Sequence, residues 1–318
     1  MACVRRRWFR RESTSSASEV SSMRNLFILI FSLTFFSLPP ASAHAAETKV
    51  PGGDAFLEGA RLQELKQWDA SLEHFRAAAD MYSLIGDYAL YRMAQVAFGM
   101  EDSDLAAASL ETLVNEHPSS PVRRRALVDL SVLYFNSGQL AQALPLLKAA
   151  LAGARWQGES ASLTLMLAKT CLGLDDRPQC DSICWQLIYN SPSTPESLEA
   201  VQLLESVDTP QKKNAVAKVY LRNKKADEAL GLLDELMTLP DTQSLLPQIL
   251  LSRAQALELK NRSEAAADTY EKLIAAYPES SVVPAALYRL GEYWRKKGFS
   301  EQALGTYEDL AKRFPSHA

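Results

Sequence analysis

The segment that decides the fold is residues 285–315, AALYRLGEYWRKKGFSEQALGTYEDLAKRFP. Apolar residues recur in it at spacings of three and four, in two runs: Leu287, Leu290 and Trp294, then Ala303, Tyr307 and Leu310. Gly298 separates the runs and Pro315 ends the second, and both residue types end helices. The segment therefore predicts two amphipathic helices joined by a short turn.

Prolines that follow helical runs give the repeat length. Pro278 and Pro315 are 37 residues apart, and Pro118 and Pro192 are separated by 74, which is twice that distance. A period of this size is typical of repeat proteins built from helix pairs. One repeat length therefore accounts for both intervals.

The unit pattern resembles that of tetratricopeptide repeats, with a small residue in the first helix and a small residue followed by an aromatic in the second. The preceding unit shows it at Leu250, Ala254, Leu257, Ala266, Tyr270 and Pro278. Scarce glycine and many alanines and leucines also favour helix. We expect an all-α fold in which about seven tetratricopeptide-like helix pairs stack into a curved superhelix over residues 54–318. An extra helix is expected at 196–207.

The amino-terminal residues have the features of an export leader. The apolar run 27–38 is short, follows Met23 and Arg24, and precedes small residues that suit cleavage after residue 43. We therefore expect a leader over 1–43, a linker over 44–53, and a start at either Met1 or Met23. The predicted location is the periplasm, with the extracellular space as the alternative.

Charge and hydropathy narrow the class of partner. Removing residues 1–43 removes six Arg and two Glu, so the net charge moves from −4 to −8. An acidic chain is unsuited to nucleic acid. The rest of the sequence contains no apolar run long enough for a membrane span. Residues 41–46, directly after the apolar run, contain no cysteine that could take a lipid anchor.

Three cysteines follow the leader, and the repeat pattern places all of them in the core. Cys180 and Cys184 are one helical turn apart, which disfavours a bond between them and favours a partner on another helix. We expect either core packing of free thiols or a disulfide from Cys171 to Cys180 or Cys184. A metal site is not expected, because no histidine lies near them.

Certain polar and aromatic residues of first helices are candidates for contact with a ligand. The concave side of such stacks is where partners usually bind. The candidate groove residues are Tyr88, Tyr91, Gln95, Tyr288, Glu292 and Arg295. They are suited to gripping a peptide or stacking on sugar rings, and packing between repeats is the alternative.

Three segments resemble the amino-terminal superhelical region of soluble lytic murein transglycosylases: LIGDYALY at 84–91, LIYNSPSTPE at 187–196 and AAYPESS at 275–281. In that family the catalytic glutamate precedes a serine in a separate carboxy-terminal domain. The Glu-Ser pairs at Glu159, Glu196, Glu205 and Glu279 fall at repeat junctions or on the extra helix, so none is expected to be catalytic.

These observations predict a periplasmic binding or scaffold module, with no cofactor and no catalytic residues of its own. The resemblance implies a role in peptidoglycan turnover, with peptidoglycan or a protein as the partner. One alternative is a protein scaffold for assembly of envelope or outer-membrane complexes. Another is a fragment of a full lytic transglycosylase.

Overall fold

The computed structural model describes residues 52–81, 83–153 and 157–315. The expected leader and most of the expected linker lie outside these residues. The described helices belong to one unit of contacts, Val50–Ala318.

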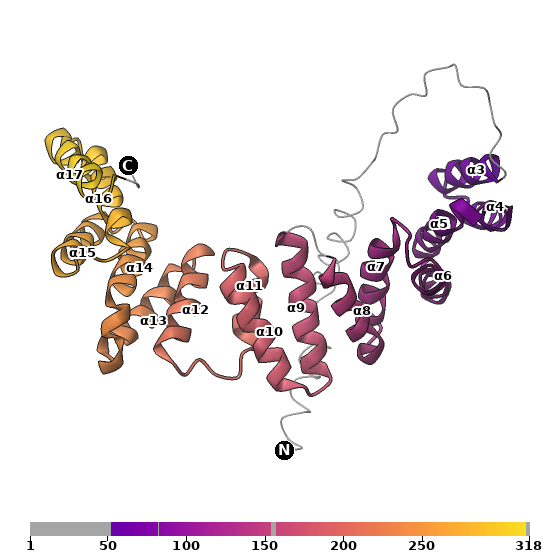
Figure 1. The fold of residues 1–318 in the computed structure, drawn as a ribbon, viewed down its shortest axis with the longest axis horizontal. Helices are drawn as coiled ribbons and strands as arrows, with labels where there is room; N and C mark the ends of the chain where they lie inside the picture. The colour runs from indigo at the N-terminus through magenta and orange to yellow at the C-terminus, as the bar shows by residue number, and fades with distance from the viewer. Residues whose placement is uncertain (1–51, 82, 154–156, 316–318) are drawn as a thin grey trace. The chain divides into compact units, whose positions relative to one another are not determined.

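The described residues form α-helices and contain no strand, which confirms the predicted all-α class. Each helix packs mainly against the helices before and after it in the chain, as the colour sequence of Figure 1 shows. The first helices of the seven pairs are α3 (Gly53–Glu64), α5 (Gly86–Gly99), α7 (Arg123–Asn136), α9 (Gln157–Gly173), α12 (Pro210–Arg222), α14 (Leu246–Leu259) and α16 (Val283–Lys297). Their second helices are α4 (Trp68–Met81), α6 (Ser103–Glu116), α8 (Leu140–Ala152), α10 (Arg177–Asn190), α13 (Ala226–Thr238), α15 (Ser263–Ala276) and α17 (Ser300–Arg313).

The additional helix α11 (Pro195–Leu203) lies between the fourth and fifth pairs. Thr194 caps its first turn by accepting a hydrogen bond from the Ser197 amide, and Pro195 occupies the first helical position. Two 3₁₀ segments, η1 (Ser83–Ile85) and η2 (Pro240–Leu245), precede α5 and α14.

One residue in the left-handed conformation ends the first helix of every pair. These residues are Lys66, Glu101, Gly138, Asp175, Lys224, Asn261 and Gly298. The residue after each donates its amide N–H to the carbonyl five positions back, as Phe299 does to Trp294 at 3.0 Å. This 6→1 bond satisfies a carbonyl at the helix end and reverses the chain for the second helix. Six of the seven recur every 37 residues on either side of α11.

Small residues set the distance between the two helices of a pair. A Cβ added at Gly291 on α16 would lie 2.6 Å from Cε1 of Tyr307 on α17. At Gly59 on α3 it would lie 3.0 Å from the ring of Phe75 on α4. In these two pairs the aromatic ring of the second helix therefore packs directly on the backbone of the first.

Candidate functional site

The candidate residues on α5 form two kinds of contact. The Tyr91 side chain is only 7% exposed, and its hydroxyl donates to Oδ2 of Asp129 on α7 at 2.7 Å. The Arg125 guanidinium lies 5.7 Å from the centre of the same ring. Tyr91 therefore follows the packing alternative: it joins two neighbouring repeats through its contacts with α7.

The other two candidates on α5 stay accessible. Tyr88 is 40% exposed, and Gln95 is partly buried and accepts a hydrogen bond from Arg92 at 3.2 Å. Burial raises the pKa of the Asp129 carboxyl and of the Tyr91 phenol. The buried pair is thus a structural link, and Tyr88 is the aromatic surface that α5 presents to solvent.

The three candidates on α16 lie in one surface cluster together with a residue of α17. The Arg295 Nε and Nη2 atoms donate to the two carboxylate oxygens of Glu292 at 3.0 and 2.8 Å. The Tyr307 hydroxyl donates to Glu292 Oε1 at 2.7 Å, and the Tyr307 ring centre is 6.3 Å from that of Tyr288. Tyr288 itself is 52% exposed.

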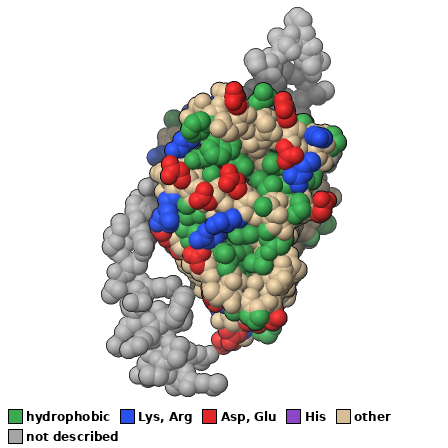
Figure 2. Space-filling view, turned by 90° about the vertical axis from the view of Figure 1, so that its left-hand side faces the viewer, with side chains coloured by type: hydrophobic (Ala, Val, Ile, Leu, Met, Phe, Trp, Pro, Cys, Tyr) green, Lys and Arg blue, Asp and Glu red, His purple; other side chains and the backbone are tan. Residues whose placement is uncertain are grey.

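These hydrogen bonds fix the charge of Glu292. Donation from Arg295, and then from Tyr307, lowers the pKa of the Glu292 carboxyl to about 2. The carboxylate therefore stays ionised and engaged at neutral pH. It is unsuited to general acid catalysis, which needs a carboxyl with a raised pKa. Figure 2 shows the side of the molecule on which α15–α17 lie in Figure 1, where hydrophobic side chains are interspersed with charged ones.

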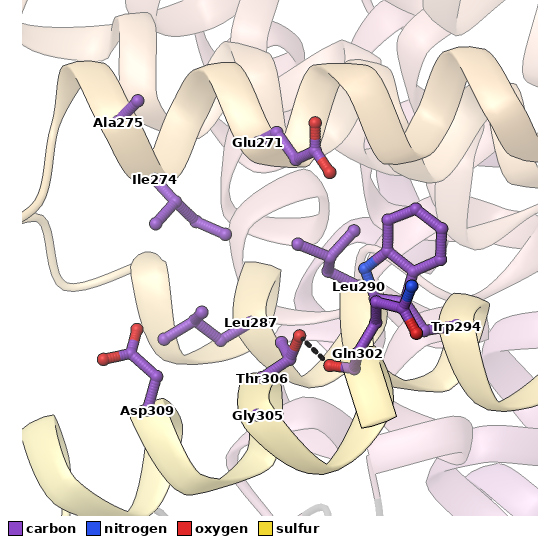
Figure 3. Close-up of a pocket in the computed structure, with 10 residues that line it drawn as sticks. All are labelled: Glu271, Ile274, Ala275, Leu287, Leu290, Trp294, Gln302, Gly305, Thr306 and Asp309. Carbon is purple, nitrogen blue, oxygen red and sulfur yellow. Dashed lines mark hydrogen bonds between the residues drawn. The ribbon is translucent and has the colours of Figure 1, made fainter. Parts of the chain in front are cut away.

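A groove lies between α15 and α17, with α16 as its floor (Figure 3). Its volume is about 520 Å³, and it is open to solvent along its length. The apolar lining consists of Ile274, Ala275, Leu287, Leu290 and Trp294, and the polar lining of Glu271, Gln302, Thr306 and Asp309, with Gly305. An apolar floor with a few polar groups at the rim is the usual composition of a binding pocket.

Local bonds hold two polar residues of the rim. The Thr306 hydroxyl donates to the backbone carbonyl of Gln302 one turn earlier at 2.7 Å (Figure 3). The Asp309 carboxylate accepts from Arg313 Nη1 at 2.9 Å. The Glu271 carboxylate has no ion-pair partner among the described residues. Glu271 is therefore the side chain of the rim most available to a cationic group.

This groove could not be identified from the sequence, because its lining comes from three helices of two repeats. Leu287, Leu290 and Trp294 belong to the periodic apolar run of the first helix, and they contact the core while also facing the groove. The available signal was Gly305, an exposed glycine inside a second helix. An added Cβ there meets no heavy atom within 4 Å.

The three cysteines lie together in the core between α9 and α10. All are buried free thiols in the structure, and Cys171 Sγ lies 3.4 Å from Gln179 Oε1. Burial raises the pKa of each thiol, and Cys180 and Cys184 also interact with each other. Such thiols react slowly. The disulfide from Cys171 remains a prediction.

Two further properties concern only the described part of the chain. It contains no cluster of three or more His, Cys, Asp or Glu side chains arranged to hold a metal ion. None of its helices is both long and apolar enough to cross a bilayer.

Comparison with known proteins agrees with the repeat pattern. Family models described as "Tetratricopeptide repeat" match residues 91–159 with one model and residues 248–280 and 285–317 with another. No curated protein matches the sequence. The helix pairs within these matched segments are thus of tetratricopeptide type.

Several solved structures are similar in arrangement. A tetratricopeptide repeat protein from Parabacteroides merdae is 11% identical over 82% of this chain and 92% of its own, with a TM-score of 0.40. The C-terminal part of a TPR repeat-containing protein from Cytophaga hutchinsonii is 17% identical over 82% and 95%, with a TM-score of 0.35. A TPR protein from Thermus thermophilus is 23% identical over 68% and 98%, with a TM-score of 0.30.

Proposed function

We propose that this chain is an exported scaffold that binds a protein partner, and that the groove between α15 and α17 takes a short segment of that partner. The observation that carries the proposal is the groove itself, since an open apolar channel between packed helices is suited to side chains of a peptide. Stacked helix pairs commonly present such extended surfaces to other proteins.

The chemistry of the groove indicates the kind of segment. Its floor is aliphatic and aromatic, and Trp294 provides the largest apolar surface. Its rim contains two carboxylates, of which Glu271 is unpaired among the described residues and Asp309 is shared with Arg313. A segment with one bulky apolar side chain flanked by Lys or Arg fits both features. The acidic net charge of the chain would also steer a basic partner toward it.

A blocked groove tests this directly. Gly305→Trp adds an indole to the lining of the groove, and an added Cβ at Gly305 meets no heavy atom within 4 Å. Gly231→Trp is the matched control: Gly231 is 74 residues earlier, at the same position of its own second helix, and is equally open. The two variants, with wild type, would be cross-linked in cells, and bound polypeptides identified by mass spectrometry.

We expect one polypeptide to be bound by wild type and by Gly231→Trp and to be lost from Gly305→Trp. A synthetic peptide from its cross-linked segment should then bind wild type in calorimetry, and Glu271→Lys should weaken that binding. Equal capture by all three proteins would contradict the assignment of the groove.

Export is the second part of the proposal, and the leader sequence supports it. Replacing Ile28 and Leu29 by Asp interrupts the apolar run of residues 27–38. Wild type should be recovered outside the cytoplasm with its amino terminus near residue 44, and the double variant should remain inside at full length. Recovery of full-length wild type in the cytoplasm would overturn this part.

A role in peptidoglycan turnover is the second candidate function. The exposed faces of Tyr88 and Tyr288 favour it, since aromatic rings stack on sugars. The resemblance to the superhelical region of lytic transglycosylases suggests a cell-wall hydrolase as the partner or as the longer protein of which this chain is a part. Purified sacculi should then retain the chain, and Tyr88→Ala with Tyr288→Ala should release it. Retention that persists in Gly305→Trp would separate this role from groove binding.

A further inference from the structure

The outward face of α17 differs from the same face of α15. Positions 37 residues apart are equivalent in the two helices. Ala267 of α15 is 4% exposed, whereas its equivalent Leu304 is 60% exposed. Tyr270 is fully buried, whereas Tyr307 is only partly buried. The difference arises because α16 covers α15, and no helix of the described residues covers this face of α17.

A repeated ion pair accompanies the covering of two second helices, α13 and α15. A lysine at the end of the next first helix reaches an acid in the first turn: Lys260 pairs with Asp227, and Lys297 pairs with Glu264 at 3.0 Å. Lys297 lies 37 residues after Lys260, and Glu264 lies 37 residues after Asp227. Glu301 is the next acid in this series, and no cation among the described residues pairs with it.

The uncovered face has a defined pattern. A helix turns about 100° per residue, which places Leu304, Tyr307 and Ala311 on one apolar stripe. Glu301, Glu308 and Lys312 lie along one edge of that stripe. Arg313 points elsewhere, to Asp309 at 2.9 Å and to the Pro278 carbonyl at 2.9 Å, so Lys312 is the available cation. The face is thus acidic at the start of the helix and basic at its end.

We propose that a second copy of this chain covers this face, with the two α17 helices antiparallel about a two-fold axis near Tyr307. This arrangement places Leu304 of each copy over the small Ala311 of the other, so that large meets small. It also places Glu301 of each copy beside Lys312 of the other. One contact thus provides both ion pairs, as expected of a self-complementary interface.

The interface is independent of the proposed groove. The groove uses Gln302, Thr306 and Asp309, which lie on another side of α17. Variants of these three residues therefore leave the dimer face intact, whereas Gly305, which also lines the groove, is one turn from Glu301 and Glu308 and is not used to separate the two sites. Glu308 lies near the two-fold axis, so the Glu308 carboxylates of the two copies face each other and their repulsion weakens the dimer.

Sedimentation equilibrium of the full chain, produced in a host that removes the expected leader, tests the pairing. Wild type should show a monomer–dimer equilibrium, and Leu304→Glu should weaken it by about tenfold or more, because an apolar side chain is no longer buried. Leu84→Glu is the matched control, since Leu84 is an exposed leucine outside α17 and should leave the dimer unchanged. Circular dichroism should show that both variants are folded.

Charge exchange tests the orientation. Glu301→Lys and Lys312→Glu should each weaken the dimer by up to about fivefold per pair, and the double variant should restore it. Glu308→Gln should strengthen it. A chain that stays monomeric at millimolar concentration, a series of larger polymers, or a dimer that Leu304→Glu leaves intact would each overturn the proposal. A dimer that the double exchange fails to restore would also overturn it.

Discussion

The pairs α14–α15 and α16–α17 share one sequence pattern and differ in what surrounds it. Both have a small residue on the first helix, Ala254 or Gly291, beneath a tyrosine of the second, Tyr270 or Tyr307. The first tyrosine is fully buried, and the second keeps its hydroxyl at the surface on Glu292. The repeat pattern therefore specifies the helices and their contacts within a pair. The next helix decides how much of the second helix is buried.

The largest expected difference is in the free energy of unfolding that is lost when each tyrosine is replaced by alanine. Tyr270→Ala should lower the free energy of unfolding by about 3–5 kcal/mol, because it leaves a cavity in a closed core. Tyr307→Ala should lower it by about 2 kcal/mol, since part of that ring already faces solvent and the bond to Glu292 is also lost. Urea titrations followed by circular dichroism would measure both. Equal losses would show that the two pairs are equally closed in solution.

Two glycines of the second pair should respond to alanine in opposite directions. Gly298 has φ +83°, so Gly298→Ala should lower the free energy of unfolding by about 1 kcal/mol. Gly305 lies inside α17 with open space around it, so Gly305→Ala should raise it by about 0.5–1 kcal/mol. Asn261 takes the place of Gly298 in the first pair. Asn261→Gly should change stability by only a few tenths of a kcal/mol, because Asn tolerates this conformation. A loss in Gly305→Ala would contradict the open environment.

Replacing each tyrosine by phenylalanine should also change the free energy of unfolding in opposite directions. The buried Tyr270 hydroxyl lies beside the Glu258 carboxyl but makes no hydrogen bond of good geometry with it, so Tyr270→Phe should raise the free energy of unfolding by up to about 1 kcal/mol. Tyr307→Phe loses the bond to Glu292 and should lower it by about 0.5–1.5 kcal/mol. Thermal unfolding of the two variants beside wild type would show the signs. Destabilisation by Tyr270→Phe would indicate a bond that this structure lacks.

The two glutamates nearest these tyrosines, Glu292 and Glu258, should change the stability of the fold with pH in opposite directions. The pKa of Glu292 falls to about 2 from an ordinary 4.5, so its stabilising effect is present above pH 4.5 and is lost as the pH falls toward 2. Burial raises the pKa of Glu258, so its effect is present below the ordinary pKa and is lost as the pH rises above it. Urea midpoints between pH 2 and pH 7 would separate the two. Glu292→Gln should reduce the acid loss, and Glu258→Gln should leave it in place.

The smallest effects are expected from the ion pairs between repeats. Lys297→Met and Lys260→Met each remove one exposed pair, with Glu264 and Asp227 respectively. Exposed pairs contribute little, so both urea midpoints should stay close to that of wild type. Raising the salt concentration should remove whatever difference remains. A large loss in either variant would mean that the lysine stem packs on the repeat before it.

Much of the fold could be predicted from residues 285–315 and the period of 37. The helix class, the turn at Gly298 and the contact of Gly291 with Tyr307 follow from spacing and residue size. The left-handed turns at Lys66, Glu101 and Lys224 could not be predicted, because Lys and Glu do not favour that conformation. They adopt it because the helices on both sides are fixed by packing and the 6→1 bond closes the turn.

Less of the candidate site could be predicted. The pattern placed Tyr88 and Tyr91 on one surface, yet one is exposed and the other is buried against Asp129. Both follow the same helical spacing, so the spacing could not separate them. The groove between α15 and α17 could not be predicted either, because each helix pattern records only the face turned toward the core.

The sequence by itself determined that this protein is a series of helix pairs, because apolar periodicity and small residues act locally, within one or two helices. The tertiary structure alone decided which faces are covered, which tyrosine is reachable, and where a groove and an unpaired helix face lie. The physical reason is that burial is a property of neighbours: Tyr270 and Tyr307 occupy equivalent positions, and only the packing of α16 distinguishes them.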